Sequence, residues 1–566
     1  MRLQQHRTGF VAWVRSGDPW IWFTAAAVSI SIAAVIGLLL LIGARGFGHF
    51  WPDSVALIRY QDNTGSTRTV LGEIAGRETL PIGQFLEADP SAAASVPADA
   101  VEVERWLVRS GNRREAPPDF RWVVAHQVEA LSHPPDALVL ERAEWGNAYG
   151  FLHSVHEGER PVASGSAALE ELERRLARAD ELRERIHALE QGRLYDINYR
   201  LERLRLDRRA LELTDADAAP DPAAMAELDA AEAELRADYR VAEAELRALR
   251  DQLGRDSIRL ELADGRQVTI GLGEIVRVWQ PNAMGTLDRV GHYFRSLWLF
   301  LSEPPREANT EGGVYPAIFG TVMMVLLMSL MVTPFGVIAA VYLREYARQG
   351  PFVRLIRIAV NNLAGVPSIV YGVFGLGFFV YFLGGSIDAL FFAEALPSPT
   401  FGTPGLLWAS LTLALLTVPV VIVSTEEGLT RIPRSLREGS LALGATKAET
   451  LFKVVLPVAS PSILTGVILA VARAAGEVAP LMLVGVVKLA PALPVDGNFP
   501  YVHLERKFMH LGFHIYDVGF QSPNVEAARP LVFATALLLV VLIIVLNLTA
   551  IMLRNRLENR YRGVEG

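Results

Sequence analysis

The chain reads Glu438-Gly-Ser-Leu-Ala-Leu-Gly444-Ala-Thr-Lys-Ala-Glu-Thr-Leu-Phe-Lys-Val454-Val-Leu456-Pro457 between two long apolar runs. A short helix that turns sharply into a second helix needs a residue free to adopt a positive φ, and Gly444 meets that need. Small residues around this glycine would let the segment sit deep in a cleft on a partner protein. Four apolar side chains would anchor it there: Leu441, Leu443, Leu451 and Phe452. The stretch therefore predicts a surface that docks another protein.

The same stretch resembles the cytoplasmic loop of ABC importer permeases, whose pattern is Glu-Ala-Ala, three residues, Gly, nine residues, Ile-x-Leu-Pro. The spacing matches at four positions: Glu438, Gly444, Leu456 and Pro457. Gly439 and Ser440 stand for the two alanines and Val454 for isoleucine, so small residues remain small and a β-branched residue remains β-branched. The resemblance implies that residues 426–457 couple the chain to an ATPase. An amphipathic linker at the membrane surface is the alternative, but a linker would not be expected to reproduce both the glycine spacing and the Leu-Pro end.

The chain contains no nucleotide-binding loop of the G-x-x-x-x-G-K-[ST] type and no Gly-Lys pair at all. We therefore expect no cofactor on this chain, with ATP and Mg²⁺ bound by a separate ATPase that is pressed against the loop. No catalytic residue is assigned, and the chain is not expected to be an enzyme. Four histidines invite a metal hypothesis, but their spacing supports no shared site, so no metal is expected: His126, His133, His153 and His156.

Composition indicates a membrane protein with a large polar part. Of 566 residues, 51% are hydrophobic, and the mean hydropathy is +0.26, which is too apolar for an ordinary soluble protein and too charged for membrane throughout. The net charge is only -8, so nothing in the balance suggests a nucleic-acid partner. Cysteine is absent, which excludes disulfides, thiolate metal sites and a cysteine nucleophile.

Six apolar runs are long enough to cross a bilayer core, which takes about 20 residues in a helix. They are residues 21–42, 317–343, 358–383, 405–423, 463–487 and 531–553. Only the fifth contains charges, Arg473 and Glu477. The first run is too long for the apolar part of a signal peptide and is followed by no small-residue cleavage motif, so we expect it to remain as an anchor.

Arginines in the short flanks predict the orientation, because cytoplasmic flanks are enriched in basic residues. Four sets fall on one side of the membrane: Arg2, Arg7 and Arg15; Arg344, Arg348, Arg354 and Arg357; Arg431, Arg434 and Arg437; Arg554, Arg556, Arg560 and Arg562. Residues 1–20 and 556–566 are accordingly predicted in the cytoplasm and residues 43–315 in the periplasm. Residues 316–555 would form the permease core in the bacterial inner membrane.

The polar stretch 43–315 carries the signals of a small α+β insertion. Alternating apolar residues in 257–262 and 266–270, joined by Asp264-Gly265, predict a β-hairpin, and residues 55–60 and 121–126 predict further strands.

Residues 166–253 carry leucines and other apolar residues separated by threes and fours, which is coiled-coil spacing. Pro220 and Pro222 interrupt the pattern, so an antiparallel helical hairpin is the simplest interpretation. We expect this hairpin to be a spacer with solvated charged faces, and a docking arm for a partner is the alternative.

Two further stretches narrow the family. The third apolar run contains Gly365-Val-Pro367-Ser368-Ile-Val-Tyr371-Gly372, which resembles the Gly-x-Pro-Ser-x-Val-Tyr-Gly run of phosphate permeases. The fifth contains Arg473-Ala-Ala-Gly476-Glu477-Val478-Ala479-Pro480-Leu481, which resembles their Arg, two residues, Gly-Glu-Thr-Ala-Pro signature, with Val478 in place of threonine. The Ala-Pro-Leu ending is typical of the PstA type rather than the PstC type. The resemblance covers the first anchor and everything after about residue 317, and the enlarged insertion resembles that of long PstA variants.

Membership of this family implies the partners. They would be a PstC-like permease in a heterodimer, two copies of a PstB-like ATPase, a periplasmic PstS-like phosphate-binding protein, and membrane lipid.

The same residues also predict a substrate path on physical grounds. Pro367 would break the third span near its middle and free backbone groups to line a cavity, beside Ser368 and Tyr371. Arg473 and Glu477, at i and i+4, would share one helix face, where the guanidinium can grip phosphate oxygens and the carboxylate limits how tightly the anion is held. The alternatives are glycine-mediated helix packing for the third span and a structural ion pair for the fifth.

The expected fold is thus an all-α integral membrane protein with six transmembrane helices of the ABC importer permease type and an external α+β insertion that carries a helical hairpin. The expected function is import of inorganic phosphate. Two rivals are a permease for sulfate or molybdate and a membrane-anchored sensor or scaffold. The Pro-Ser-Ile-Val-Tyr-Gly run argues against the first, and six spans with the 438–457 loop argue against the second.

Overall fold

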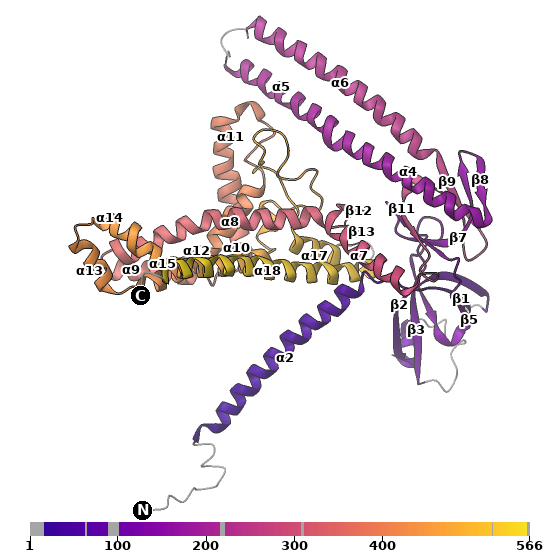
Figure 1. Ribbon diagram of the computed structural model, residues 1–566, viewed down its shortest axis with the longest axis horizontal. Coiled ribbons are helices and arrows are strands. Elements are labelled where there is room, and N and C mark those ends of the chain that lie inside the picture. Colours follow the sequence, from indigo (N-terminus) through magenta and orange to yellow (C-terminus); the bar gives the residue numbers. More distant parts are fainter. Residues whose placement is uncertain are drawn as a thin grey trace, which may run out of the picture.

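The structure is a computed structural model and describes residues 16–62, 65–88, 101–214, 221–306, 309, 311–522 and 525–562. A bundle of long apolar helices forms one part, and a module of β-strands with a long helical hairpin forms the other (Figure 1). The start of helix α2 (Asp18–Gly48) and the end of helix α18 (Val525–Arg562) both lie away from the strands (Figure 1).

Six helices in the described chain are long and apolar enough to cross a membrane, as predicted. The first and last are α2 and α18, and the second is α8 (Tyr315–Val341) with its π-helical extension Tyr342–Tyr346. The third consists of α10 (Ser368–Phe374), a π-helical stretch (Gly375–Gly384) and α11 (Gly385–Phe391). The fourth is α12 (Leu406–Arg431), and the fifth joins α14 (Lys447–Thr450), a π-helical turn (Leu451–Val455) and α15 (Leu456–Gly476).

The third span begins about ten residues later than the apolar run predicted. Residues 351–363 form a separate amphipathic helix, α9 (Pro351–Leu363), and Pro367 is the N-cap residue of α10. The prediction that Pro367 breaks a span near its middle is therefore wrong. Proline lacks the amide that a helix interior needs and biases the residue before it towards extended backbone, so the chain leaves α9 and restarts there.

Helix α12 lies at the centre of the bundle, with two thirds of its most apolar window buried, whereas α2 buries none of its own. The largest apolar cluster lies where α12 packs against α8 and α15 and includes Met324, Met328, Leu413, Val421 and Ala470. Helix α2 meets α18 at a close crossing, because a Cβ on Gly46 would lie only 2.9 Å from the carbonyl oxygen of Phe533. The rest of α2 projects away from the bundle (Figure 1).

The module of β-strands, here called the β-module, contains two main antiparallel sheets. One has the order β4-β3-β2-β1-β5, formed by Phe120–Val124, Glu102–Arg109, Thr67–Pro81, Val55–Gln61 and Val128–Ser132. The other has the order β10-β9-β7-β6-β11, formed by Gln267–Gly271, Asp256–Glu261, Ala148–Glu157, Leu138–Arg142 and Ile275–Trp279, with β8 (Arg160–Ser164) paired to β7. The β9–β10 hairpin turns at Gly265 with φ 81°, so the hairpin predicted at residues 257–270 is confirmed.

The helical hairpin is also confirmed. It runs through α4 (Ala168–Ala188), a π-helical turn (Leu189–Leu194) and α5 (Tyr195–Thr214), and returns in α6 (Pro222–Gly254). Pro222 is the first residue of α6, next to its capping Asp221. The seam between the arms buries Leu182, Leu189, Leu194, Ile197, Ala242, Leu246 and Leu249. Leu172 and Leu176 of the first arm pack instead into the core of the β-module.

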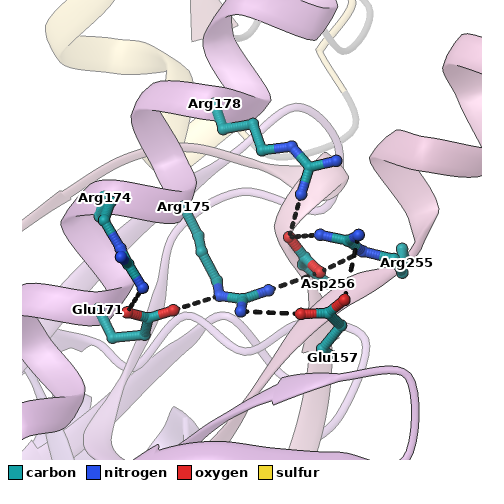
Figure 2. Close-up of polar contacts among 7 residues, drawn as sticks. All are labelled: Glu157, Glu171, Arg174, Arg175, Arg178, Arg255 and Asp256. Atoms are coloured by element: carbon teal, nitrogen blue, oxygen red, sulfur yellow. Dashed lines mark hydrogen bonds and ion pairs between the residues drawn. The ribbon is translucent and has the colours of Figure 1, made fainter.

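A charged cluster fixes the base of the hairpin to the β-module (Figure 2). Arg175 of α4 contacts Asp256 of β9 at 2.8 Å and Glu157 of β7 at 2.9 Å, and Glu171 one turn earlier at 2.6 Å. Burial by itself raises the pKa of Asp256, but hydrogen bonds and charge from Arg255 and Arg175 outweigh it, so that the pKa ends below its usual value. The hairpin thus leaves the module in a fixed direction.

Helix α7 (Thr286–Ser302) connects the module to the bundle. Two-residue strands β12 (Pro305–Arg306) and β13 (Glu311–Gly312) lie between α7 and α8.

Candidate functional site

The fifth span ends inside the apolar run that predicted it. Helix α15 stops at Gly476, Glu477 has extended backbone (φ −81°, ψ 130°), and a single turn, α16 (Leu481–Val484), follows Pro480. Arg473 lies in the last turn of α15, and its Nε is 3.6 Å from Oε1 of Glu477. The expected pairing is therefore present, although Glu477 lies just beyond the helix rather than on its face. Both side chains are partly exposed, so the pair borders open space rather than a sealed core.

The third span packs directly against this break. A Cβ on Gly372 would lie 2.7 Å from the Cα atom of Pro480, so only glycine permits the approach. Tyr371 is buried, donates its hydroxyl proton to the carbonyl of Leu363 at 2.7 Å, and lies within electrostatic reach of Arg473. The structure thus brings three of the predicted path residues together: Tyr371, Arg473 and Glu477.

The two other predicted path residues lie at the start of the third span. Pro367 is exposed, and Ser368 is the first residue of α10, one turn before Tyr371. The predicted alternative, close helix packing through glycine, holds just after this motif. A Cβ on Gly375 would lie 2.3 Å from Oγ1 of Thr412 in α12. Among the residues that the structure describes, the one atom within 4 Å of the Cβ position of Gly365 is the carbonyl oxygen of Asn362, at 3.4 Å, so this glycine marks no helix crossing there.

A cavity of about 400 Å³ opens at the end of the bundle away from the β-module, between α9, α12 and the end of α8. Its charged lining comprises Arg344, Arg357, Arg431, Glu426 and Glu427. Arg357 is paired with Glu426 at 3.3 Å. From the sequence, these arginines were used only to predict orientation. The cavity could not be predicted, because its lining comes from separate helices and shows no regular spacing in the sequence.

The predicted coupling loop forms a compact two-helix turn at that same end. Helix α13 (Arg434–Ala442) contains Glu438, Gly439 and Ser440, and Gly444 then adopts φ +88°, as its position predicted. Thr446 begins α14 with a reciprocal cap to Glu449.

The loop is fixed to the bundle by a few polar contacts. Arg437 pairs with Glu345 at 3.0 Å, and the ammonium of Lys447 donates to the carbonyl of Glu345 at 2.7 Å. Ser440 and Thr450 share a hydroxyl hydrogen bond of 2.9 Å, which joins the two helices of the turn. Leu456 and Pro457 begin α15.

Three of the four predicted apolar anchors point outward. Leu443 is 91% exposed, Phe452 is 68% exposed and Leu441 is 47% exposed. Leu451 is buried against the bundle, so the prediction that it faces a partner is wrong. The π-helical turn at Leu451–Val455 directs this side chain inward.

The hairpin rests on the loop between the fifth and sixth spans of the permease core, a contact that the sequence did not predict. The hydroxyl of Tyr195 on α5 donates to Asp496 at 3.1 Å, and the hydroxyl of Tyr199 donates to the carbonyl of Phe499 at 2.5 Å. These pairs are 301 and 300 residues apart in sequence, and no local pattern links them. The hairpin is therefore seated on the core and is not a free-standing spacer.

A polar network stabilises the loop beneath the hairpin. Nε2 of the buried His503 lies 2.9 Å from Asp496, and Arg506 approaches the same carboxylate at 2.6 Å. Burial alone raises the pKa of Asp496, but hydrogen bonds from the Asn498 amide and from Arg506 outweigh that effect and lower the pKa to about 2. The loop returns to the break in the fifth span, where the amide of Phe508 donates to the carbonyl of Gly485.

Comparisons with known proteins agree with this architecture. Residues 332–563 match the family described as binding-protein-dependent transport system inner membrane component. The phosphate transport system permease protein PstA of Mycobacterium leprae is 42% identical over 188 residues, which is 33% of this chain and 56% of that protein. PstA 1 of Mycobacterium tuberculosis H37Rv is 36% identical over 281 residues, or 49% and 80%, and PstA of Yersinia pestis is 32% identical over 255 residues, or 45% and 77%.

Two solved structures show a more distant likeness. An inward-facing MetNI methionine ABC transporter chain is 18% identical, with a TM-score of 0.32 over 46% of this chain and 98% of that one. A chain of a bacterial ABC transporter for alginate import is 13% identical, with a TM-score of 0.32 over 46% and 82%. Both TM-scores are low, so the family of this chain is established by its sequence similarity to the PstA proteins. The chain belongs to the PstA family of phosphate transport system permease proteins, the membrane-spanning subunits of binding-protein-dependent ABC importers.

Proposed function

We propose that this chain conducts inorganic phosphate into the cell through the break in its fifth span. Its similarity to PstA permeases, at 36% identity across 80% of the Mycobacterium tuberculosis protein, is the observation that carries the proposal. The chain is a multi-pass inner-membrane protein and not itself an enzyme, and its family works with an ATPase and a substrate-binding protein.

The chemistry of the break suits an oxyanion. A guanidinium offers two parallel N–H donors to phosphate oxygens, and Arg473 lies where α15 ends and the backbone opens. Glu477, 3.6 Å away, neutralises Arg473 when no anion is present and keeps the anion from binding too tightly when one passes. Tyr371, whose hydroxyl donates to the carbonyl of Leu363 at 2.7 Å, packs beside the break and would help to fix its shape.

The more specific partners are also part of the proposal. A PstC-like permease would complete a heterodimer that binds two PstB-like ATPases with ATP and Mg²⁺. One of these ATPases would bind the exposed Leu443 and Phe452 of the coupling loop. A PstS-like protein would deliver phosphate on the side of the β-module. Both termini would be cytoplasmic and residues 43–315 periplasmic, which agrees with the start of α2 and the end of α18 lying away from the strands (Figure 1).

The test combines purification with uptake in cells. Affinity-tagged chain should co-purify with a second permease and an ATPase, and cells that lack the chain should lose high-affinity uptake of labelled phosphate and regain it on complementation. Labelled sulfate and molybdate uptake are the controls. Restoration of sulfate or molybdate uptake without phosphate uptake would assign the chain to another oxyanion, and absence of an ATPase from the complex would contradict an importer.

A further inference from the structure

Helix α7 presents apolar side chains on two neighbouring faces. Tyr293, Leu297 and Phe300 pack into the cluster that joins the external ends of the spans. A second stripe consists of Leu287, Phe294 and Trp298, which the 3.6-residue period places on one face. These three side chains are 87%, 63% and 68% exposed, respectively.

The position of α7 is fixed where two spans leave the membrane. The rings of Phe50 and Trp51, just past the end of α2, lie 6.2 and 6.3 Å from the ring of Tyr293 in the middle of α7. The last turn of α7 is joined to the start of α8, because the amide of Val314 donates to the carbonyl of Phe300 at 2.8 Å. Figure 1 shows α7 at the junction between the bundle and the β-module. The stripe therefore lies at the height of the bilayer surface.

Exposed aromatic side chains also lie where the first span ends. Phe47, in the last turn of α2, and Trp51, just past its end, are 51% and 41% exposed. Tryptophan gathers at membrane–water interfaces, where its ring sits at the level of the headgroups, and phenylalanine is common on the apolar face of interfacial helices. Arg295, on the flank of the stripe, is exposed and can reach headgroup phosphates.

We propose that the stripe of Leu287, Phe294 and Trp298 lies in the bilayer surface on the side of the β-module, so that α7 is an interfacial helix that sets the height and tilt of the module above the transport route. An amphipathic helix of this kind buries its apolar face about 5–10 Å into the boundary between headgroups and acyl chains. Lipid is favoured over a second protein because α7, which carries the stripe, contacts the ends of two spans, and because leucine, phenylalanine and tryptophan are typical of the buried face of interfacial helices.

The cysteine-free chain allows a direct test. Single variants Phe294→Cys and Trp298→Cys would be spin-labelled in the assembled transporter and reconstituted in vesicles of phosphatidylethanolamine and phosphatidylglycerol. Val241→Cys is the matched control, because Val241 is an apolar residue that is 58% exposed near the middle of α6 in the hairpin. Arg295→Cys reports on the flank of the same helix.

Oxygen concentrates in lipid, and a nickel chelate stays in water. We expect the labels at 294 and 298 to collide severalfold more with oxygen than with the chelate, and the label at 241 to show the reverse preference. Chelate access at 294 and 298 equal to that at 241 would overturn the proposal in favour of a water-exposed stripe. Labels immobilised and shielded from both reagents would overturn it in favour of a protein partner. Either result would leave phosphate uptake, and hence the proposed function, untouched.

Discussion

Gly444 adopts φ +88° at the turn between the two helices of the coupling loop, and a Cβ there would meet nothing within 4 Å. The position thus requires glycine for its backbone conformation and not for space. A β-branched residue in the left-handed backbone region costs about 1–2 kcal/mol of conformational free energy. At position 444 it would therefore change the backbone and the direction of the exposed Leu443 beside it.

We expect Gly444→Val to uncouple the chain from its ATPase without unfolding the membrane core. Gly439→Ala is the matched control, because Gly439 is helical, its Cβ position is open, and alanine is the residue that the importer pattern has there. The measurement is retention of the ATPase on purified complex, together with helix content. Retention of the ATPase by Gly444→Val at the level of the control would remove the coupling role from this turn.

The guanidinium of Arg473 distinguishes a role in anion transport from a purely structural ion pair. Arg473→Lys keeps the charge near Glu477 but loses the planar two-pronged grip on an oxyanion, so we expect normal assembly and phosphate uptake reduced by about tenfold or more, equivalent to ~1.4 kcal/mol. The double variant Arg473→Leu, Glu477→Gln removes both charges of the pair, so that neither is left without its partner. If the pair is only structural, the double variant regains the uptake that either single change removes, and Arg473→Lys transports normally.

At the scale of elements, the seat of the hairpin is the most specific feature. Asn498 of the loop between the fifth and sixth spans donates to Asp196 of α5 at 3.1 Å, next to the two tyrosine contacts. A short bismaleimide should therefore join Asp196→Cys to Asn498→Cys in the otherwise cysteine-free chain.

The control pair is Leu213→Cys with Asn498→Cys, because Leu213 is exposed near the far end of the same helix, about 25 Å along it at 1.5 Å per residue. We expect a shift in electrophoretic mobility for the pair at positions 196 and 498 and none for the control pair. This result would confirm that the hairpin contacts the loop. Equal yields from both pairs, or none from either, would contradict the seat.

The elements differ in how far local sequence specifies them. The buried seam of the hairpin, from Leu182 to Leu249, could be predicted from apolar residues spaced by threes and fours. This spacing places them on one face of each helix, where the two arms meet. The end of the fifth span at Gly476 could not be predicted from hydropathy, because residues 478–487 remain apolar after the helix stops. The contact of Tyr195 with Asp496 could not be predicted either. It depends on the direction of the hairpin, which is fixed by the charged cluster at the base of the hairpin (Figure 2).

For the whole molecule, orientation in the membrane is the property on which every partner depends. The arginine flanks predict that the β-module and hairpin lie outside and the coupling loop inside. Protease added to intact spheroplasts should cut between about residues 163 and 224 and spare residues 431–457. Cleavage in the coupling loop with protection of the hairpin would invert the topology and remove the basis for both the ATPase and the binding-protein contacts.

Import of phosphate by this chain and its partners should be driven by ATP. The most direct measurement uses the purified complex in vesicles, with ATP and Mg²⁺ on the side of the coupling loop and the phosphate-binding protein with labelled phosphate on the other. We expect phosphate to accumulate against its gradient in a manner that requires ATP and, when Arg473 is intact, is not reduced by excess sulfate or molybdate. Equilibration that is independent of ATP, or equal transport of sulfate or molybdate, would contradict this expectation.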